Sequence, residues 1–194
     1  MTKKRGQKPE KRDWAGTDLP DHLKPVSAIG PIVSSVHLAE GGSQGLSEVE
    51  YGLILASHAF HRWMVRCMAA AGVPGLTPME IMVLHTIRHR DRGKKLSDIC
   101  LVLDIEDTHV ATYAIRKLEA AGLVTTGRQG KEKTVRITPN GAEACGRYAQ
   151  IRERLLVAST AKARPSEETL SEIAAVLRFL SGAYEQSARA ATTL

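Results

Sequence analysis

The sequence predicts a mainly α-helical protein with a small β-hairpin wing, that is, a winged helix-turn-helix flanked by long dimerisation helices. Three observations predict this class: two helical segments joined by a tight turn, two strand-like segments directly after them, and long amphipathic segments on both sides. With 194 residues and a hydrophobic fraction of 43%, the chain is long enough for one folded domain and an extension.

The central segment of the sequence is Asp104–Val124. Five apolar side chains recur in it at helical spacing and are predicted to face a core: Val110, Ala111, Ala114, Ile115 and Leu118. Four others are predicted to point away from that core: His109, Thr112, Tyr113 and Arg116. The preceding stretch, Leu96–Leu103, predicts a short helix opened by Ser97. Only two residues separate the two segments, which predicts a helix-turn-helix.

A hairpin is predicted directly after the second helix. Gly122 ends that helix, and the runs LVTTGR and KTVRIT follow on either side of a turn that contains a glycine. A helix-turn-helix followed by a basic hairpin is typical of winged-helix proteins, which place the second helix in the major groove of DNA. We therefore interpret the hairpin as a wing.

The net charge of +6 is unevenly distributed along the chain. Residues 1–12 carry six Lys or Arg residues against one Glu, so the remainder is almost neutral. Within that remainder, residues 85–95 hold five Lys or Arg residues against one carboxylate, and residues 125–136 hold four against one. Both clusters flank the second predicted helix. We therefore favour contact with DNA phosphates over the alternative that they are two solvated loops.

Four runs of the sequence carry a family resemblance. They are LTPMEIMVLHTI from Leu76, LSDICLVL from Leu96, KLEAAGLV from Lys117 and ITPNGAE from Ile137. These runs resemble the MarR family of bacterial transcription regulators, and with the flanking long helices the resemblance covers about residues 47–190. It implies a homodimer in which paired recognition helices read a palindromic site in double-stranded DNA.

We divide the chain into an extension and a domain. Residues 1–46 are expected to form an irregular basic N-terminal extension, and residues 47–194 a MarR-like winged-helix domain. That domain is expected to contain a DNA-binding core at 76–138 and dimerisation helices at 47–72 and 139–190. Residues 25–42 are apolar enough to pack, either as an arm across a partner subunit or against their own domain.

Capping signals predict where the helices begin. A capping box at residues 47–50 predicts a helix to Gly72, and a second box at residues 77–80 predicts a helix through about His89. Two further helices are predicted, one from Thr138 to about Lys162 with Pro139 at its first position, and one from Ser166 onward.

Two of these helices carry continuous apolar seams. The first seam consists of Val49, Leu53, Ala56, Phe60, Trp63, Cys67 and Ala70. The second consists of Leu170, Ile173, Leu177, Leu180 and Tyr184. An unbroken seam needs another helix along its length. Because so small a domain offers too little surface for all the seams, we expect a homodimer in addition to packing within one chain.

Nine residues on the second helix and the wing are predicted to contact DNA: Thr108, His109, Thr112, Tyr113, Arg116, Lys117, Arg128, Lys131 and Lys133. The arginine of the helix can bind guanine, and its Thr and Tyr can contact phosphate or a thymine methyl group. The wing cations would reach the backbone or the minor groove. The helix opens with Glu106 and Asp107, which either cap it or oppose phosphate. This acidic opening motivates an alternative function, a winged-helix protein-interaction module without specific DNA binding.

The MarR resemblance also implies a cleft for a small, often aromatic effector. Four residues are expected to line it together with Phe60: His61, Arg62, Trp63 and Met64. The same residues would also serve as ordinary core.

The sequence gives little indication of catalysis, of a cofactor or of a metal site. No P-loop, Gly-x-Gly-x-x-Gly, Cys-x-x-Cys or HExxH pattern occurs, so we expect neither an enzyme nor a cofactor nor a metal site. The cysteines Cys67, Cys100 and Cys145 lie in apolar helical patterns, which predicts buried, reduced thiols. Neither a secretion signal nor a membrane-spanning run is present, so we expect a cytoplasmic, nucleoid-associated protein without membrane contact.

Overall fold

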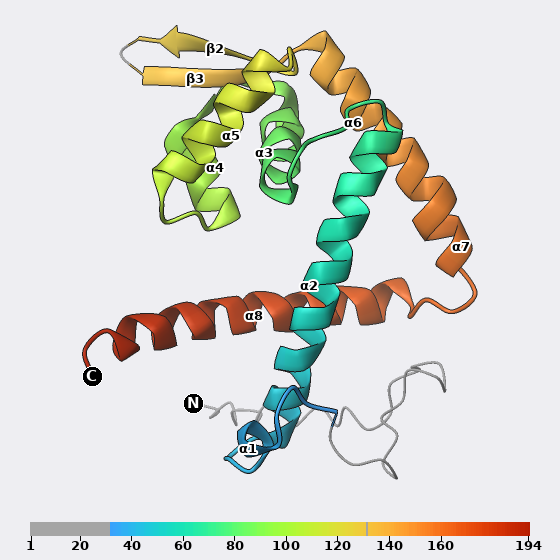
Figure 1. The fold of residues 1–194 in the computed structure, drawn as a ribbon, viewed down its shortest axis with the longest axis vertical. Helices are drawn as coiled ribbons and strands as arrows, with labels where there is room; N and C mark the ends of the chain where they lie inside the picture. Colours follow the sequence, from blue (N-terminus) through green and yellow to red (C-terminus); the bar gives the residue numbers. More distant parts are fainter. Residues whose placement is uncertain (1–31, 131) are drawn as a thin grey trace, which may run out of the picture. The chain divides into compact units, whose positions relative to one another are not determined.

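The computed structural model describes residues 32–130 and 132–194 (Figure 1). Most of the predicted N-terminal extension therefore lies outside the described residues. The described chain forms two compact units, residues 32–159 and residues 160–194.

The first unit contains helices, a small sheet and two irregular turns. Its elements in order are α1 (Val36–Ala39), α2 (Gln44–Ala70), α3 (Pro78–Arg88), the 3-10 turn η3 (His89–Asp91), β1 (Lys94–Lys95), α4 (Leu96–Leu103), α5 (Thr108–Ala120), β2 (Val124–Gln129), β3 (Glu132–Ile137), α6 (Pro139–Arg152), the π-helical turn Glu153–Val157 and α7 (Ala158–Thr160). The mainly helical class with a winged helix-turn-helix is thereby confirmed.

The core of the first unit is built around α3. Its side chains Ile81, Val83, Leu84 and Ile87 are completely buried. The helix packs against α2, α4, α5, α6 and β3, which together surround it. Since α3 contributes so many of the buried apolar side chains, it positions both the helix-turn-helix and the wing.

The two helices of the helix-turn-helix are α4 and α5. Between them Asp104 adopts a left-handed conformation (φ 54°) and the amide of Ile105 donates to the carbonyl of Cys100 at 2.9 Å, which closes the first helix. The prediction that Ser97 opens α4 was wrong. The helix begins at Leu96, directly after β1, and Lys95 is its N-cap.

The inner face of α5 is close to the predicted one. Ala111, Ala114, Ile115 and Leu118 are buried, but Val110 is 42% exposed, so its assignment to the core was wrong. Val110 lies in the first turn of α5, one residue before the first buried position, Ala111. The predicted outward face is confirmed, since the side chains of His109, Tyr113 and Arg116 are exposed and Thr112 is half-buried.

The predicted wing is an antiparallel hairpin of β2 and β3, paired from Val124 opposite Ile137 to Gln129 opposite Glu132. A third strand, β1, adds to the other edge of β3, with Lys94 opposite Val135. The sequence did not predict β1, because two residues are too few to show an alternating pattern.

Helix α2 begins one turn earlier than predicted. Ser43 is its N-cap and accepts from the amide of Leu46 at 3.3 Å. Ser47 lies inside the helix, where its hydroxyl donates to the carbonyl of Leu38 at 2.6 Å. The amide of Ile32 donates to the Glu48 carboxylate at 3.2 Å, and α1 contacts α2. Residues 32–42 therefore pack against α2 of the same chain.

The other predicted caps are confirmed. Thr77 and Glu80 form a reciprocal capping box at the start of α3. Thr138 accepts from the amide of Gly141 at 3.1 Å at the start of α6, and helical structure then continues to Thr160, close to the predicted end at Lys162.

The second unit consists mainly of α8 (Glu167–Ala191), which is capped by Ser166 as predicted. Among the described residues, α8 buries none of its side chains. Three residues of its predicted seam, Ile173, Leu177 and Tyr184, are exposed in the single chain, and Leu170 and Leu180 are half-buried.

Gly141 is required by the close approach of α6 to the start of the wing. A Cβ at this position would overlap the carbonyl oxygen of Leu123 and the side chain of Ile137. Gly146, one turn further along α6, has open space around its Cα.

We expect Gly141→Ala to lower the free energy of unfolding by about 2–4 kcal/mol, because the added methyl group forces the backbone apart. The matched variant Gly146→Ala should raise it by about 0.5–1 kcal/mol, since alanine favours a helix. Urea unfolding of both variants measures the difference. Equal stability of the two variants would contradict the close approach.

Candidate nucleic-acid interface and ligand pocket

The outer face of α5 presents polar side chains to solvent. Thr108, His109 and Arg116 are exposed, and Tyr113 is 67% exposed. The carboxylate of Asp107 accepts from the amide of His109 at 2.8 Å, so it caps the helix. One of the two acidic groups at this end therefore has a structural role, while Glu106 is exposed.

The wing brings two cations together. Arg128 and Lys133 are both exposed and lie directly opposite each other in the hairpin. Like charges in this position repel each other, so a polyanion that lies across both would relieve the repulsion. Lys131 lies outside the described residues, and its predicted role stays a prediction.

The recognition helix and the wing meet in one small hollow. Thr112 and Arg116 from α5 and Lys133 from β3 all line it. Three of the predicted DNA-contacting residues are thus next to each other, although they are up to 21 residues apart in the sequence.

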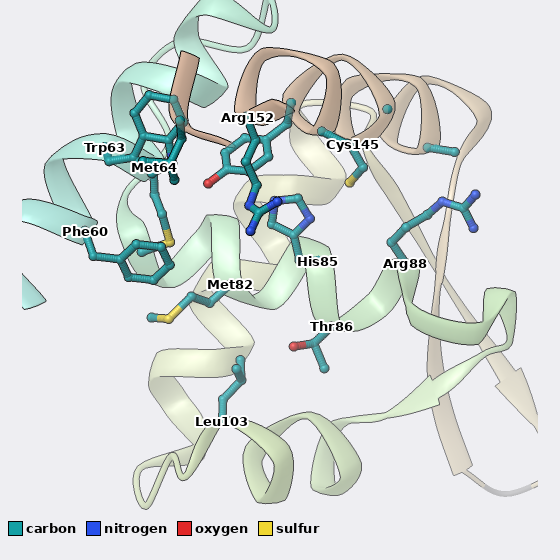
Figure 2. A pocket seen from close by; sticks show the side chains of 15 residues that line it. Phe60, Trp63, Met64, Met82, His85, Thr86, Arg88, Leu103, Cys145 and Arg152 are labelled. Atoms are coloured by element: carbon teal, nitrogen blue, oxygen red, sulfur yellow. The ribbon is translucent and has the colours of Figure 1, made fainter. Parts of the chain in front are cut away.

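A larger pocket of about 840 Å³ lies between α2, α3 and α6 (Figure 2). Apolar and aromatic side chains dominate its walls: Phe60, Trp63 and Met64 from α2, Met82 from α3, Leu103 from α4, and Tyr148 from α6. Its volume and lining are typical of a small-molecule site.

The pocket corrects half of the sequence prediction. Trp63 and Met64 line it, whereas His61 and Arg62 do not. Successive residues of a helix are rotated by about 100°, so the face that presents residues 60, 63 and 64 turns residues 61 and 62 away.

His85 is a polar residue that lines the pocket and that the sequence did not assign to it. Its Nε2 atom is buried and has no hydrogen-bond partner among the described residues. Burial lowers the pKa of His85, so the ring is neutral at pH 7, and its edge contacts the ring of Tyr148 at a centroid distance of 4.7 Å. The exposed guanidinium of Arg152 also lines the pocket and pairs with Glu153 at 3.0 Å.

The three cysteines are buried, as predicted, and none of them forms a disulfide with another. Burial raises the pKa of the Cys67 and Cys145 thiols, which keeps them protonated. Among the described residues, His, Cys, Asp and Glu side chains form no group of three or more that could hold a metal ion. Within the same part of the chain, none of the helices has the length and apolar character needed to cross a bilayer.

Comparison with known proteins identifies a matching domain family and solved structures with a similar fold. Residues 76–141 match the family model of the winged helix DNA-binding domain. No curated protein sequence matches the chain. Among solved structures, a MarR transcriptional regulator from Methanosarcina mazei is 15% identical, with a TM-score of 0.58, and the match covers 77% of this chain and 99% of that one.

Two further structures carry a ligand. MepR of S. aureus, solved as a complex with DNA, is 15% identical with a TM-score of 0.56, over 70% of this chain and 95% of MepR. CouR of Rhodococcus jostii, bound to p-coumaroyl-CoA, is 15% identical with a TM-score of 0.56, over 71% of this chain and 95% of CouR. This chain has the MarR fold. The resemblance found in the sequence is confirmed at the level of the fold.

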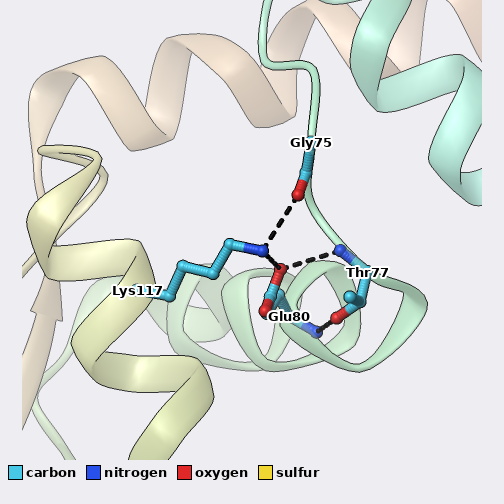
Figure 3. A network of polar contacts seen from close by, with 4 residues as sticks. All are labelled: Gly75, Thr77, Glu80 and Lys117. Carbon is cyan, nitrogen blue, oxygen red and sulfur yellow. Dashed lines mark hydrogen bonds and ion pairs between the residues drawn. The ribbon is translucent and has the colours of Figure 1, made fainter.

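In this MarR fold, Lys117 serves the interior of the domain. Its ammonium pairs with the buried carboxylate of Glu80 at 3.0 Å and donates to the carbonyl of Gly75 at 3.0 Å (Figure 3). The same carboxylate accepts from the amide of Thr77 at 2.7 Å. Since these contacts occupy the Lys117 ammonium, we remove this residue from the predicted DNA interface.

Glu119 positions the wing of the MarR fold and was missed by sequence reasoning. Its carboxylate accepts from both the amide of Thr126 at 2.9 Å and the hydroxyl of Thr126 at 2.6 Å. These hydrogen bonds lower the pKa of Glu119, so it stays ionised. A contact between residues seven positions apart, across a turn, has no periodic signal in the sequence.

Proposed function

We propose that the protein is a sequence-specific transcription regulator that binds double-stranded DNA as a homodimer in the cytoplasm, at the nucleoid. The observation that carries this proposal is the exposed polar face of α5 next to the cationic wing, within the matched winged helix domain. MepR, which shares the fold, was solved as a complex with DNA, which supports DNA binding by this fold.

In the proposed complex, α5 enters the major groove of DNA. Arg116 donates to a guanine edge, while Thr112 and Tyr113 contact phosphate or a thymine methyl group. Thr108 and His109 lie at the helix N-terminus, where backbone amides favour a phosphate. Arg128 and Lys133 of the wing, with Lys131, contact the backbone or the neighbouring minor groove.

The second candidate function is a protein-interaction module without specific DNA binding. Its motivation is the charge of residues 96–124, which carry five carboxylates against two cations. Selection of bound sequences from a random DNA pool separates the two functions. An enriched palindrome supports the regulator, and the absence of enrichment at low salt supports the module.

We expect Arg116→Ala and Arg128→Ala each to weaken binding to the selected DNA by about tenfold, because each removes a charge-assisted hydrogen bond. Only Arg116→Ala should relax the sequence preference, and only the wing variant should act equally on all sequences. Fluorescence anisotropy over a range of salt concentrations measures both effects. Arg66→Ala, on the exposed surface of α2, is the control. Unchanged affinity of both variants, or affinity independent of salt, would contradict DNA binding.

The homodimer is proposed from the exposed apolar side chains of α8. Large apolar side chains along this helix are exposed in the single chain, including Ile173, Val176, Leu177 and Tyr184. Exposed apolar area of this kind is typical of a protein interface. A second copy of the chain would supply helices with the same seams, as a two-fold interface requires.

We expect Leu177→Glu to convert the dimer to a monomer, because it places a charge in the middle of the seam. Ala175→Glu adds the same charge on the opposite side of α8 and should leave the dimer intact. Sedimentation equilibrium of both variants measures the mass. A wild-type chain that sediments as a monomer at all concentrations would refute the homodimer.

A small-molecule effector is proposed for the pocket between α2, α3 and α6. The side chain of His85, whose buried Nε2 has no hydrogen-bond partner among the described residues, lines this mainly apolar pocket together with the Arg152 guanidinium. An aromatic ring with one acidic group matches this combination of surfaces. CouR, with p-coumaroyl-CoA bound, shows an aromatic ligand on the same fold.

Benzoate is a minimal probe of the effector pocket. We expect it to change the fluorescence of Trp63 and to weaken DNA binding, and His85→Phe to reduce benzoate affinity about tenfold by removing the Nε2 hydrogen bond. His61→Phe, which changes a neighbouring residue outside the pocket, should bind benzoate as the wild type does. The variant Trp63→Phe retains only the other tryptophan, so its fluorescence shows how much of the benzoate signal comes from Trp63. Benzoate binding that is unaffected by His85→Phe would contradict the proposed role of the pocket.

A further inference from the structure

A second cavity lies beside the C-terminal end of α3. It has a volume of about 670 Å³ and is bounded by α3, η3, β1 and α4. Its cationic side chains are Arg90 on η3, Arg92 just after it and Lys94 on β1, and its apolar side chains are Leu101 and Val102 on α4. The carboxylate of Asp98, in the first turn of α4, also lines it. It shares only His85 and Thr86 with the effector pocket, so the two cavities have largely separate walls.

Lys94 is the unusual residue of this cavity. The residue lies in strand β1, and only 6% of its surface is exposed. Burial lowers the pKa of Lys94, and the charges of Arg92 and Arg90 lower it further, while Asp98 acts in the opposite direction. A lysine residue with so little exposed surface is normally paired with a carboxylate. Among the described side chains, no ion pair with Lys94, Arg90 or Arg92 is present.

The backbone holds these cations close together. Arg90 adopts a left-handed conformation (φ 60°), which is costly for a residue with a Cβ. A Cβ added at Gly93 would lie 3.3 Å from the guanidinium of Arg136, so a further cation approaches the same loop. Positive charge is therefore concentrated here although like charges repel, and a bound anion would compensate for that repulsion.

We propose that this cavity binds a small organic phosphate, with the phosphate on Arg90, Arg92 and Lys94 and an apolar group on Leu101 and Val102. Two guanidinium groups and an ammonium match the oxygens and the double charge of a phosphate monoester. Its volume is within the range of small-molecule sites. This proposal does not rest on the proposed DNA binding, because the two use different residues.

The apolar side chains of the cavity distinguish a small molecule from the DNA backbone. Leu101 is 83% exposed and Val102 is 68% exposed, and both line the cavity together with the cations. DNA phosphates are flanked by sugars and further phosphates, and they offer no apolar group for these two side chains. An organic phosphate covers the apolar side chains and neutralises the cations together.

Phenyl phosphate is a suitable probe, and its binding to the full chain without DNA is measured by isothermal titration calorimetry. We expect one site per chain, with inorganic phosphate at least about tenfold weaker because it lacks the apolar group. Lys94→Met and Arg92→Gln should each weaken phenyl phosphate at least about tenfold. Lys95→Met, which changes the next residue of β1, outside the cavity, is the matched control and should bind as the wild type does.

Folding of the variants is checked by thermal unfolding. Lys94→Met removes a charge from a buried position, so it should be at least as stable as the wild type. Arg90→Asn is a second variant, because asparagine tolerates the left-handed conformation and lacks the guanidinium. It should also bind phenyl phosphate at least about tenfold more weakly.

Three outcomes would overturn the proposal. The first is no binding of phenyl phosphate at millimolar concentration. The second is binding that Phe60→Leu abolishes and Lys94→Met does not, since this would place the probe in the effector pocket. The third is no phenyl phosphate binding together with weaker, less salt-dependent DNA binding by Lys94→Met and Arg92→Gln, which would make the cluster a DNA backbone contact.

Discussion

The packing of α5 against α3 determines which side chains of α5 meet solvent. Ala111 and Ala114 are small and almost completely buried, so the two helices approach closely, and Leu118 fills the space beyond them. The ion pair between Lys117 and the buried Glu80 then fixes the end of α5 to the start of α3. With the inner face held in this way, the polar outer face has one orientation, which a surface that reads DNA needs.

Much of the fold could be predicted because helical periodicity and capping are local properties. Thr77, Thr138 and Ser166 each cap the helix that the sequence assigned to them. Ser47 shows the limit of this reasoning. Its Ser-x-x-Glu pattern lies one turn inside α2, and only the contact with α1 explains why a serine is there. A capping motif specifies a possible helix start, whereas the preceding residues decide whether the helix has already begun.

The candidate site could be predicted only where function depends on one face of one helix. The exposed positions of α5 follow from its helical periodicity. Only some of the residues that line the pocket were predicted from the sequence. The role of Lys117 depends on a carboxylate 37 residues earlier in the chain, which no spacing rule connects to it. Strand β1 and its buried Lys94 were missed for the same reason, since the strand exists only through its pairing with β3. Contacts between distant segments are set by tertiary packing, which a single sequence does not display.

The first turn of α6 gives the wing a fixed pivot. The amide of Thr138 donates to the carbonyl of Leu123 at 3.0 Å, and its hydroxyl donates to the carbonyl of Gly122 at 2.7 Å, so both ends of the hairpin are joined where α6 starts. Further along, Tyr148 of the same helix lines the pocket between α2, α3 and α6. A change in the tilt of α6 would thus be transmitted to the hairpin as a rotation about Leu123, with the largest displacement at its tip.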